Sequence, residues 1–369
     1  MTQFSAVVAA NRGYQPGLSA FVNSFKIHHP KNEIKLYVLD YDLEPEFLAK
    51  HKDKIDEVIK ITHPKGHVYA TKLERFRVAC EIGGVVGIYD SDMYNTASML
   101  NYYKIADAGF VVGASNASNN RYGKHWHEKF KMDDIPEVFD YKTVTSVPLI
   151  MDIEKHGNDV WGGMYKHKAE TGAGADFDLV NIFLMKTGRM DDIIILNCEI
   201  CTGVHHLQIK PETRAYWKGG KLMTMNGLEV LTVHGRFWEG NWCANLMKPM
   251  PKHLARMGIR SSKSKAFQGA LQSRDILQAE FDKYCDWPYD KTVKDATLEN
   301  VQREMDLFFT ETDDLESENQ KLAKMNLDLN EQLRHTERQI ALLEKANNEI
   351  EIIKEPVEPS TDISISPYE

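Results

Sequence analysis

The chain has no apolar run of the roughly 18 residues that a membrane-spanning helix needs. Its first residues also lack the charged segment that opens a secretory signal peptide. Cysteine is scarce and odd in number, with five among 369 residues. Such usage is not typical of a disulfide framework and fits a reducing compartment. We therefore expect a cytoplasmic protein with no signal peptide and no transmembrane segment.

Charge is unevenly distributed along the chain. Residues 298–369 carry 18 acidic and 7 basic side chains, whereas the other 297 residues carry 36 acidic and 38 basic ones. The net charge of −9 therefore belongs to the C-terminal tail. The body is close to neutral and is able to bind an anionic ligand. With 42% hydrophobic residues, it can also build a substantial core.

Apolar runs alternate with helical patterns in the first part of the chain. We expect strands at residues 4–10, 34–39, 57–61, 84–89, 110–113, 145–151 and 228–233. We expect helices at 16–25, 47–55, 69–80 and 176–185, and a polar loop at 116–120. This alternation predicts an α/β fold, with a Rossmann-like sheet flanked by helices. Ligands of such sheets collect at the carboxyl ends of the strands, where Asn11 and Asp90 lie.

Two carboxylates, Asp90 and Asp92, directly follow the apolar run at 84–89. Side chains at i and i+2 point the same way in an extended chain, and they converge on one cation where the backbone turns. A bound Mn²⁺ or Mg²⁺ would hold a diphosphate by its oxygens and stabilise its charge as it leaves. The Asp-x-Asp pattern by itself equally describes a solvated turn, so the interpretation depends on the rest of the chain.

Four further segments stand in order around this pair: 8–14 (VAANRGY), 71–76 (TKLERF), 174–181 (GADFDLVN) and 233–242 (VHGRFWEGNW). Together they resemble the GT-A fold glycosyltransferases, in particular the retaining family that contains glycogenin and the bacterial lipooligosaccharide galactosyltransferases. The resemblance implies a GT-A mixed sheet and a metal-dependent transfer of sugar from a nucleotide-sugar, UDP-linked, with retention. It leaves the acceptor open among a glycan, a lipid-linked sugar, a protein and a nucleic acid.

The resemblance also implies roles for single residues. The implied ligands of Mn²⁺ or Mg²⁺ are Asp90, Asp92 and His234. The implied donor-binding residues are Ala9, Asn11, Tyr14, Lys72, Arg75, Ser91 and Arg236. The implied catalytic residues, beside the reacting sugar, are Asp176 and Asp178. Two carboxylates and one imidazole leave positions on the ion for phosphate oxygens, whose remaining charge Lys72 and Arg236 can offset.

Two alternatives to a glycosyltransferase stay open. Phe177 stands where the family has a Gln beside the aspartate. This favours a catalytically inactive, oligomeric module that binds a nucleotide-sugar, although the retained aspartates and His234 favour an enzyme. The other alternative is a nucleotidyltransferase, which normally has a Gly-rich loop with Lys or Arg directly after the first strand. Residues 11–14 (NRGY) match such a loop poorly.

The expected domains are a transferase domain at 1–247, a basic helical extension at 248–297, a coiled coil at 298–354 and a disordered tail at 355–369. Residues 248–274 contain seven Lys or Arg and no acid. This segment suits a solvated helical face, peripheral contact with an anionic membrane, or contact with the phosphates of a nucleic acid.

The coiled-coil prediction rests on a heptad pattern near the C-terminus. One heptad position holds Leu315, Leu322, Leu329, Thr336, Leu343 and Ile350. The partner position holds Asn319, Asn326, Leu333, Ile340 and Asn347. The pattern predicts a homo-oligomer of defined register and low oligomer number, because Asn recurs in the seam. The alternative is one amphipathic helix that lies on its own body.

Overall fold

The computed structural model describes most of the chain up to residue 292 and a smaller share of the residues beyond it. The described residues are 2–62, 73–115, 143–172, 176–196, 201–203, 214–239, 265–292, 303, 307, 322–334, 336, 337 and 340. The chain divides into two compact units, Met1–Asp306 and Leu307–Glu369. Among the helices of the described residues, none has both the length and the apolar character needed to cross a bilayer. The predicted domain boundaries at 247, 297 and 354 stay predictions.

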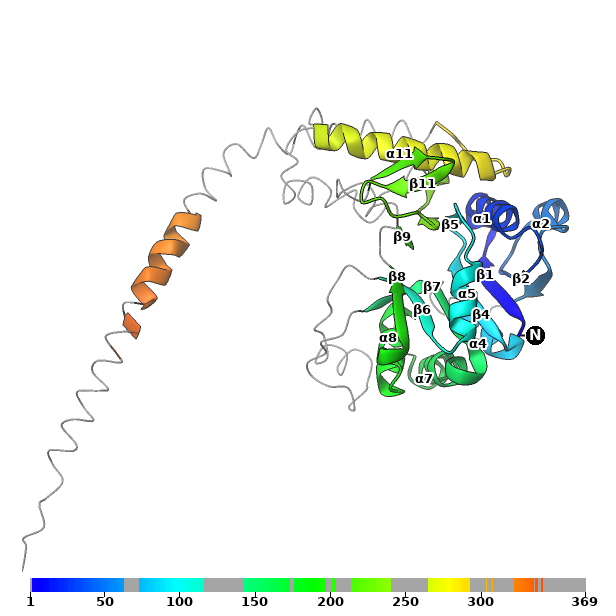
Figure 1. Ribbon diagram of the computed structural model, residues 1–369, viewed down its shortest axis with the longest axis horizontal. Helices are drawn as coiled ribbons and strands as arrows, with labels where there is room; N and C mark the ends of the chain where they lie inside the picture. Colours follow the sequence, from blue (N-terminus) through cyan, green and yellow to red (C-terminus); the bar gives the residue numbers. More distant parts are fainter. Residues whose placement is uncertain are drawn as a thin grey trace, which may run out of the picture. The chain divides into compact units, whose positions relative to one another are not determined.

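A seven-stranded sheet forms the centre of the first unit, in the order β3-β2-β1-β4-β7-β6-β8 (Figure 1). Its strands are β1 (Phe4–Ala10), β2 (Ile34–Asp40), β3 (Glu57–Lys60), β4 (Val85–Asp90), β6 (Val111–Ser115), β7 (Val144–Asp152) and β8 (Ile193–Leu196). The first four run parallel, as the alternating pattern predicts. Strand β7 runs antiparallel to both of its neighbours, so the sheet is mixed. The predicted α/β class, a mixed sheet flanked by helices, is confirmed.

Helices surround this sheet (Figure 1). They are α1 (Gln15–His28), α2 (Pro45–His51), α4 (Glu74–Ile82), α5 (Leu100–Asp107), the π-helix η2 (Ile153–Gly162), α7 (Gly163–Thr171) and α8 (Asp176–Lys186). Helix α11 (Lys265–Tyr284) instead contacts α1 and the strand at Ala215–Lys218. Short 3₁₀ turns lie at η1 (Arg12–Tyr14), η3 (Met190–Asp192) and η5 (Phe237–Glu239). The predicted helix at 47–55 starts two residues earlier, because Pro45 suits a first helical turn, and ends at His51.

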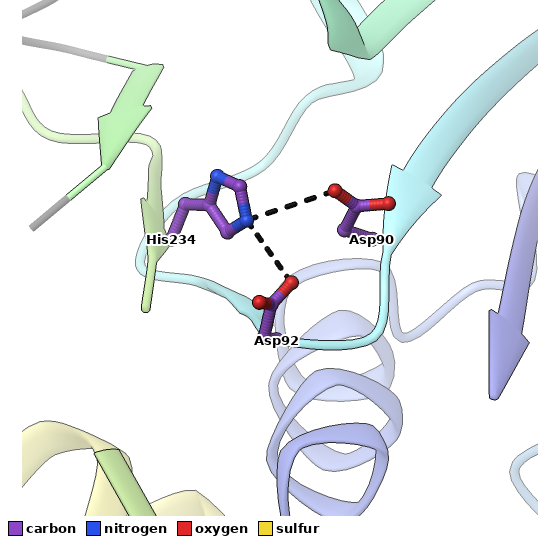
Figure 2. Close-up of side chains that lie close together, drawn as sticks. All are labelled: Asp90, Asp92 and His234. Atoms are coloured by element: carbon purple, nitrogen blue, oxygen red, sulfur yellow. Dashed lines mark hydrogen bonds and ion pairs between the residues drawn. The ribbon is translucent and has the colours of Figure 1, made fainter. Parts of the chain in front are cut away.

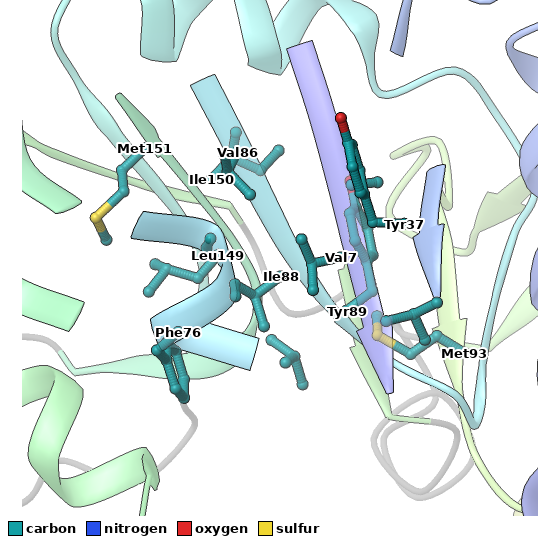
Figure 3. Close-up of a cluster of buried hydrophobic side chains, with 14 of the residues drawn as sticks. Val7, Tyr37, Phe76, Val86, Ile88, Tyr89, Met93, Leu149, Ile150 and Met151 are labelled. Atoms are coloured by element: carbon teal, nitrogen blue, oxygen red, sulfur yellow. The ribbon is translucent and has the colours of Figure 1, made fainter. Parts of the chain in front are cut away.

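The core lies along the central strands. Strands β1 and β4 are almost continuously apolar, and so are residues 147–151 of β7, as expected for strands covered on both faces. Figure 3 shows part of this cluster, in which the labelled side chains are buried: Val7, Tyr37, Phe76, Val86, Ile88, Tyr89, Met93, Leu149, Ile150 and Met151. This packing holds the carboxyl ends of β1 and β4 at fixed positions, side by side.

Smaller strands complete the first unit. A three-stranded sheet has the order β5-β12-β9, formed by β5 (Met93–Asn95), β12 (Thr232–His234) and β9 (Cys201–Gly203). A hairpin joins β10 (Ala215–Lys218) to β11 (Lys221–Thr224). The predicted strand at 228–233 is therefore wrong in its first part. Residues 228 and 230 instead form backbone hydrogen bonds with β11, and only 232–234 pair as a strand.

Five predicted features lie wholly or partly outside the described residues. They are the loop at 116–120, the start of the helix at 69–80, most of the basic segment 248–274, most of the coiled coil at 298–354 and the whole tail at 355–369. The described part of the basic segment belongs to α11.

The end of α11 is tied to the N-terminal helices by polar contacts. Ser19 in α1 donates a 2.6 Å hydrogen bond to Asp286, and Nε2 of the buried His51 lies 2.9 Å from the same carboxylate oxygen. Asn23 donates to the carbonyl of Tyr284 at 2.7 Å. Burial would raise the pKa of Asp286, but the hydrogen bonds from Ser19 and His51 lower it to about 2.

This depressed pKa makes a prediction about acid stability. A carboxylate whose folded pKa lies below its unfolded value of about 4 stabilises the protein above that value and loses this contribution as the pH falls from about 4 to 2. Because the Asp286 side chain is 40% exposed, solvent screening reduces the contribution to about 1 kcal/mol. Between pH 4.5 and 2.5, we expect the unfolding free energy of Asp286→Asn, measured with urea, to fall by about 1 kcal/mol less than that of the wild type. An unchanged slope would contradict this.

Candidate functional site

Two carboxylates and an imidazole meet where β4 ends. Asp90 is the last residue of β4, and a tight turn through Ser91 and Asp92 leads into β5. Strand β12 pairs antiparallel with β5 and sets His234 opposite Met93. The amide of the next residue, Gly235, also donates to the Asp92 carbonyl at 2.8 Å. The backbone itself therefore holds His234 against the turn, although 142 positions separate it from Asp92.

Figure 2 shows that one imidazole nitrogen faces both carboxylates. Nε2 of His234 lies 3.0 Å from Oδ1 of Asp92 and 3.7 Å from Oδ2 of Asp90. One ligand atom from each of the three residues lies within 4.8 Å of the others. Carboxylate oxygens with one imidazole suit Mn²⁺ or Mg²⁺, so the donor set fits such an ion. The structure brings the predicted metal ligands together, and their binding of an ion stays a prediction.

An arginine engages the second oxygen of Asp90. Arg75, on α4, is almost fully buried, and its Nη1 donates to the Tyr89 carbonyl at 2.8 Å and to Oδ1 of Asp90. Its Nη2 lies 3.6 Å from Oδ2 of Asp176, the first residue of α8. One buried guanidinium therefore links the candidate metal ligand to a candidate catalytic carboxylate.

A second arginine lies beside Asp92. Nε of Arg236 is 3.8 Å from Oδ2 of Asp92, and Nη2 contacts the Tyr14 hydroxyl. The guanidinium also lies over the Tyr14 ring, 4.9 Å from its centroid. Burial lowers the pKa of Arg236, but Tyr14, Glu239 and Asp92 together raise it, so this side chain remains charged. Two predicted donor-binding residues, Tyr14 and Arg236, are thus in contact.

Helix α1 approaches the Asp90–Asp92 turn closely because residue 17 is glycine. A Cβ on Gly17 would lie 2.5 Å from the Ser91 carbonyl oxygen and would also meet the Trp238 ring. Trp238 packs edge-on against Tyr14, with ring centroids 5.6 Å apart. Only a residue without a side chain allows this approach, which leaves Ser91 only 5% exposed. Its predicted contact with the donor stays a prediction.

The end of β1 lies next to this cluster. Ala9 pairs in register with Asp90, and Asn11 follows directly after the strand. The Oδ1 atom of Asn11 is buried, and it has no hydrogen-bond partner in the part of the chain that the structure describes. Buried amide oxygens normally have a donor. The predicted role of Asn11 in binding a nucleotide stays a prediction.

For two other predicted site residues, Asp178 and Lys72, the structure gives little information. Asp178 is half-buried in the first turn of α8, two positions after Asp176. Lys72 lies outside the described residues. The roles predicted for Asp176, Asp178 and Lys72 therefore stay predictions.

The sequence patterns do not indicate the residue that attaches α8 to the sheet. Asn181 is fully buried, accepts from the Val144 amide at 2.9 Å and donates to the Val144 carbonyl at 2.9 Å. These bonds attach the middle of α8 to the start of β7. A polar residue on an otherwise apolar helix face is the one sequence signal of such a role.

The chain is similar to solved structures of glycosyltransferases. For the galactosyltransferase LgtC in complex with donor and acceptor sugar analogues, the identity is 14%, the TM-score 0.44 and the coverage 69% of this chain and 96% of LgtC. For the bifunctional glycosyltransferase WbbM, the identity is 10%, the TM-score 0.43 and the coverage 74% of this chain and 52% of WbbM. For GlyE from Streptococcus pneumoniae TIGR4, the identity is 14%, the TM-score 0.37 and the coverage 57% of this chain and 47% of GlyE.

This chain therefore spans about half the length of the WbbM and GlyE chains. No family model and no curated protein matches it.

Proposed function

We propose that the chain is a metal-dependent glycosyltransferase that moves a sugar from a UDP-sugar to an acceptor, with retention. The observation that carries the proposal is the meeting of Asp90, Asp92 and His234 at the carboxyl end of a parallel strand. This is the edge of an α/β sheet where ligands collect. The order of the sequence motifs supports the same class of reaction.

A divalent ion would neutralise the charges around the three candidate ligands. Arg75 pairs with both Asp90 and Asp176, and Arg236 pairs with both Asp92 and Glu239, so without an ion the four carboxylates exceed the two guanidiniums by two negative charges. A bound Mn²⁺ or Mg²⁺ would stabilise the negative charge of the departing UDP as the bond between its oxygen and the anomeric carbon breaks. Arg236, half-exposed beside Asp92, is placed to share that charge through hydrogen bonds.

The remaining residues divide into a nucleotide end and a sugar end. Asn11 and Tyr14 follow β1 and are our proposed contacts with the base and ribose of the nucleotide. Asp176, joined to Asp90 through Arg75, is our proposed residue beside the sugar, with Asp178 in the same turn. The acceptor oxygen forms the new bond to the anomeric carbon, and its proton leaves with the phosphate oxygens or solvent.

The test is release of UDP from a panel of UDP-sugars, with Mn²⁺ or with EDTA, and with water as the default acceptor. We expect slow hydrolysis of one donor that requires Mn²⁺. Calorimetric binding of UDP without release from any donor would overturn the proposal and leave a binding module. Formation of pyrophosphate from UTP and a sugar phosphate would overturn it in favour of a nucleotidyltransferase.

A further inference from the structure

An apolar stripe is exposed on the helix of the second unit. Residues 322–334 are helical, and every one of them is exposed. Four leucines and isoleucines of the stripe are each exposed by half or more: Leu322, Leu329, Leu333 and Ile340. Within a water-soluble helix, a regular apolar stripe of this kind calls for a partner surface.

The stripe repeats every seven residues with the spacing of a coiled-coil seam. Leu322, Leu329 and Thr336 occupy position d, and Asn326, Leu333 and Ile340 occupy position a. Leu327 is just as exposed but occupies position b, on the outer face. The described residues therefore include apolar side chains both on and off the seam, which allows a matched test.

We propose that the partner is a second copy of the chain, and that the two helices form a parallel, in-register, two-stranded coiled coil. The asparagines at position a specify this arrangement. In a parallel pair, Asn326 faces Asn326 of the second copy, and the two amides bond to each other. In an antiparallel pair, position a faces position d, so a buried amide would face a leucine and lose its hydrogen bonds.

Charges beside the seam favour the same direction. Between residues 323 and 351, the charged side chains at position e are all glutamates: Glu337, Glu344 and Glu351. Position g in this stretch holds only Met325, Gln332, Gln339 and Ala346. A parallel pair sets e against g, so glutamates meet neutral side chains. An antiparallel pair sets e against e, so glutamates would face glutamates and repel.

Leucine at d with asparagine at a also limits the assembly to two strands, because buried asparagine favours dimers over larger bundles at some cost in stability. A parallel pair attaches both N-terminal units to the same end of the coiled coil. This inference does not depend on the proposed enzymatic function.

The first test compares two identical substitutions in the full-length chain, with mass measured by light scattering at micromolar concentration. We expect the wild type and Leu327→Glu to have twice the mass of one chain, and Leu329→Glu to have the mass of one. A monomeric wild type, a trimer or tetramer, or a Leu329→Glu variant that stays dimeric would overturn the proposal. The melting temperature of each variant reports that the N-terminal unit is folded.

The second test determines direction. Asn326→Cys and Leu333→Cys are oxidised separately, with Asp328→Cys, on the outer face, as the control. In a parallel, in-register pair, each of the two seam positions faces itself, so we expect an intermolecular disulfide in both variants and not in the control. In an antiparallel pair, only a residue at the midpoint of the overlap lies beside its own counterpart, so at most one of the two variants could form the disulfide. A disulfide in only one seam variant, or in neither, would therefore overturn the proposed direction.

Discussion

Asp92→Asn is expected to lower the Mn²⁺-dependent release of UDP by at least about 100-fold. Oδ1 of Asp92 lies 3.0 Å from Nε2 of His234, so the two atoms face the same candidate metal site. Replacing the carboxylate removes both a ligand atom and a negative charge from the candidate metal site. Even residues that only support metal ligands cost about 10–100-fold when they are changed, so the loss of a direct ligand should exceed that range. The measurement is the initial rate of UDP release at saturating UDP-sugar.

The control for this variant is Glu170→Gln, which removes an exposed carboxylate on α7 that pairs with the exposed Lys166. Its rate and its melting temperature should match the wild type. A titration with Mn²⁺ separates two outcomes for Asp92→Asn, since a weakened site should regain part of its rate at high Mn²⁺. A variant as active as the wild type at low Mn²⁺ would exclude Asp92 as a ligand.

Arg75→Met is expected to lower the free energy of unfolding by about 3 kcal/mol in the absence of metal. The guanidinium is almost fully buried and compensates both Asp90 and Asp176, whose side chains are 14% and 12% exposed. Removing one partner from a buried ion pair leaves an uncompensated charge and costs about 3–5 kcal/mol. The partial exposure of the two carboxylates places our expectation at the lower end of this range. Urea unfolding in EDTA measures it.

Arg77→Met is the matched control, because Arg77 lies two residues away on the same helix. Its pairs with Glu74 and Glu81 are on the surface, so its removal should cost less than about 1 kcal/mol. A further expectation is specific to the site. With Arg75 gone, Mn²⁺ becomes the main countercharge of Asp90, so Mn²⁺ should raise the melting temperature of Arg75→Met more than that of the wild type. An equal rise would show that Asp90 does not face the ion.

The local patterns of the sequence determined the parts of the fold that depend on neighbouring residues. The apolar runs correctly predict β1, β2 and β4, because a strand covered on both faces needs apolar side chains at nearly every position. The end of each run then places Ala9, Asn11 and Asp90 at one edge of the sheet, which the register confirms. The i, i+2 spacing predicts that Asp90 and Asp92 converge, and their carboxylates do face one imidazole.

Other features of the fold are predicted wrongly, or not at all, because they depend on segments far apart in the chain. Residues 228–231 are apolar enough for a strand, yet 228 and 230 form backbone hydrogen bonds with β11, and only 232–234 pair with β5 as a strand. The antiparallel direction of β7 also has no local signal, because a strand has the same side-chain pattern in either direction.

The sequence by itself therefore determined the parallel half of the sheet and the pair of aspartates at its edge. Resemblance to a family, rather than a local pattern, indicated His234. Only the tertiary structure placed that imidazole on the aspartates, through the pairing of β12 with β5. It also decided that Arg75 is buried between Asp90 and Asp176. The physical reason is that periodicity records which side chains are buried, whereas the partners of a buried charge depend on the packing of segments far apart in the chain.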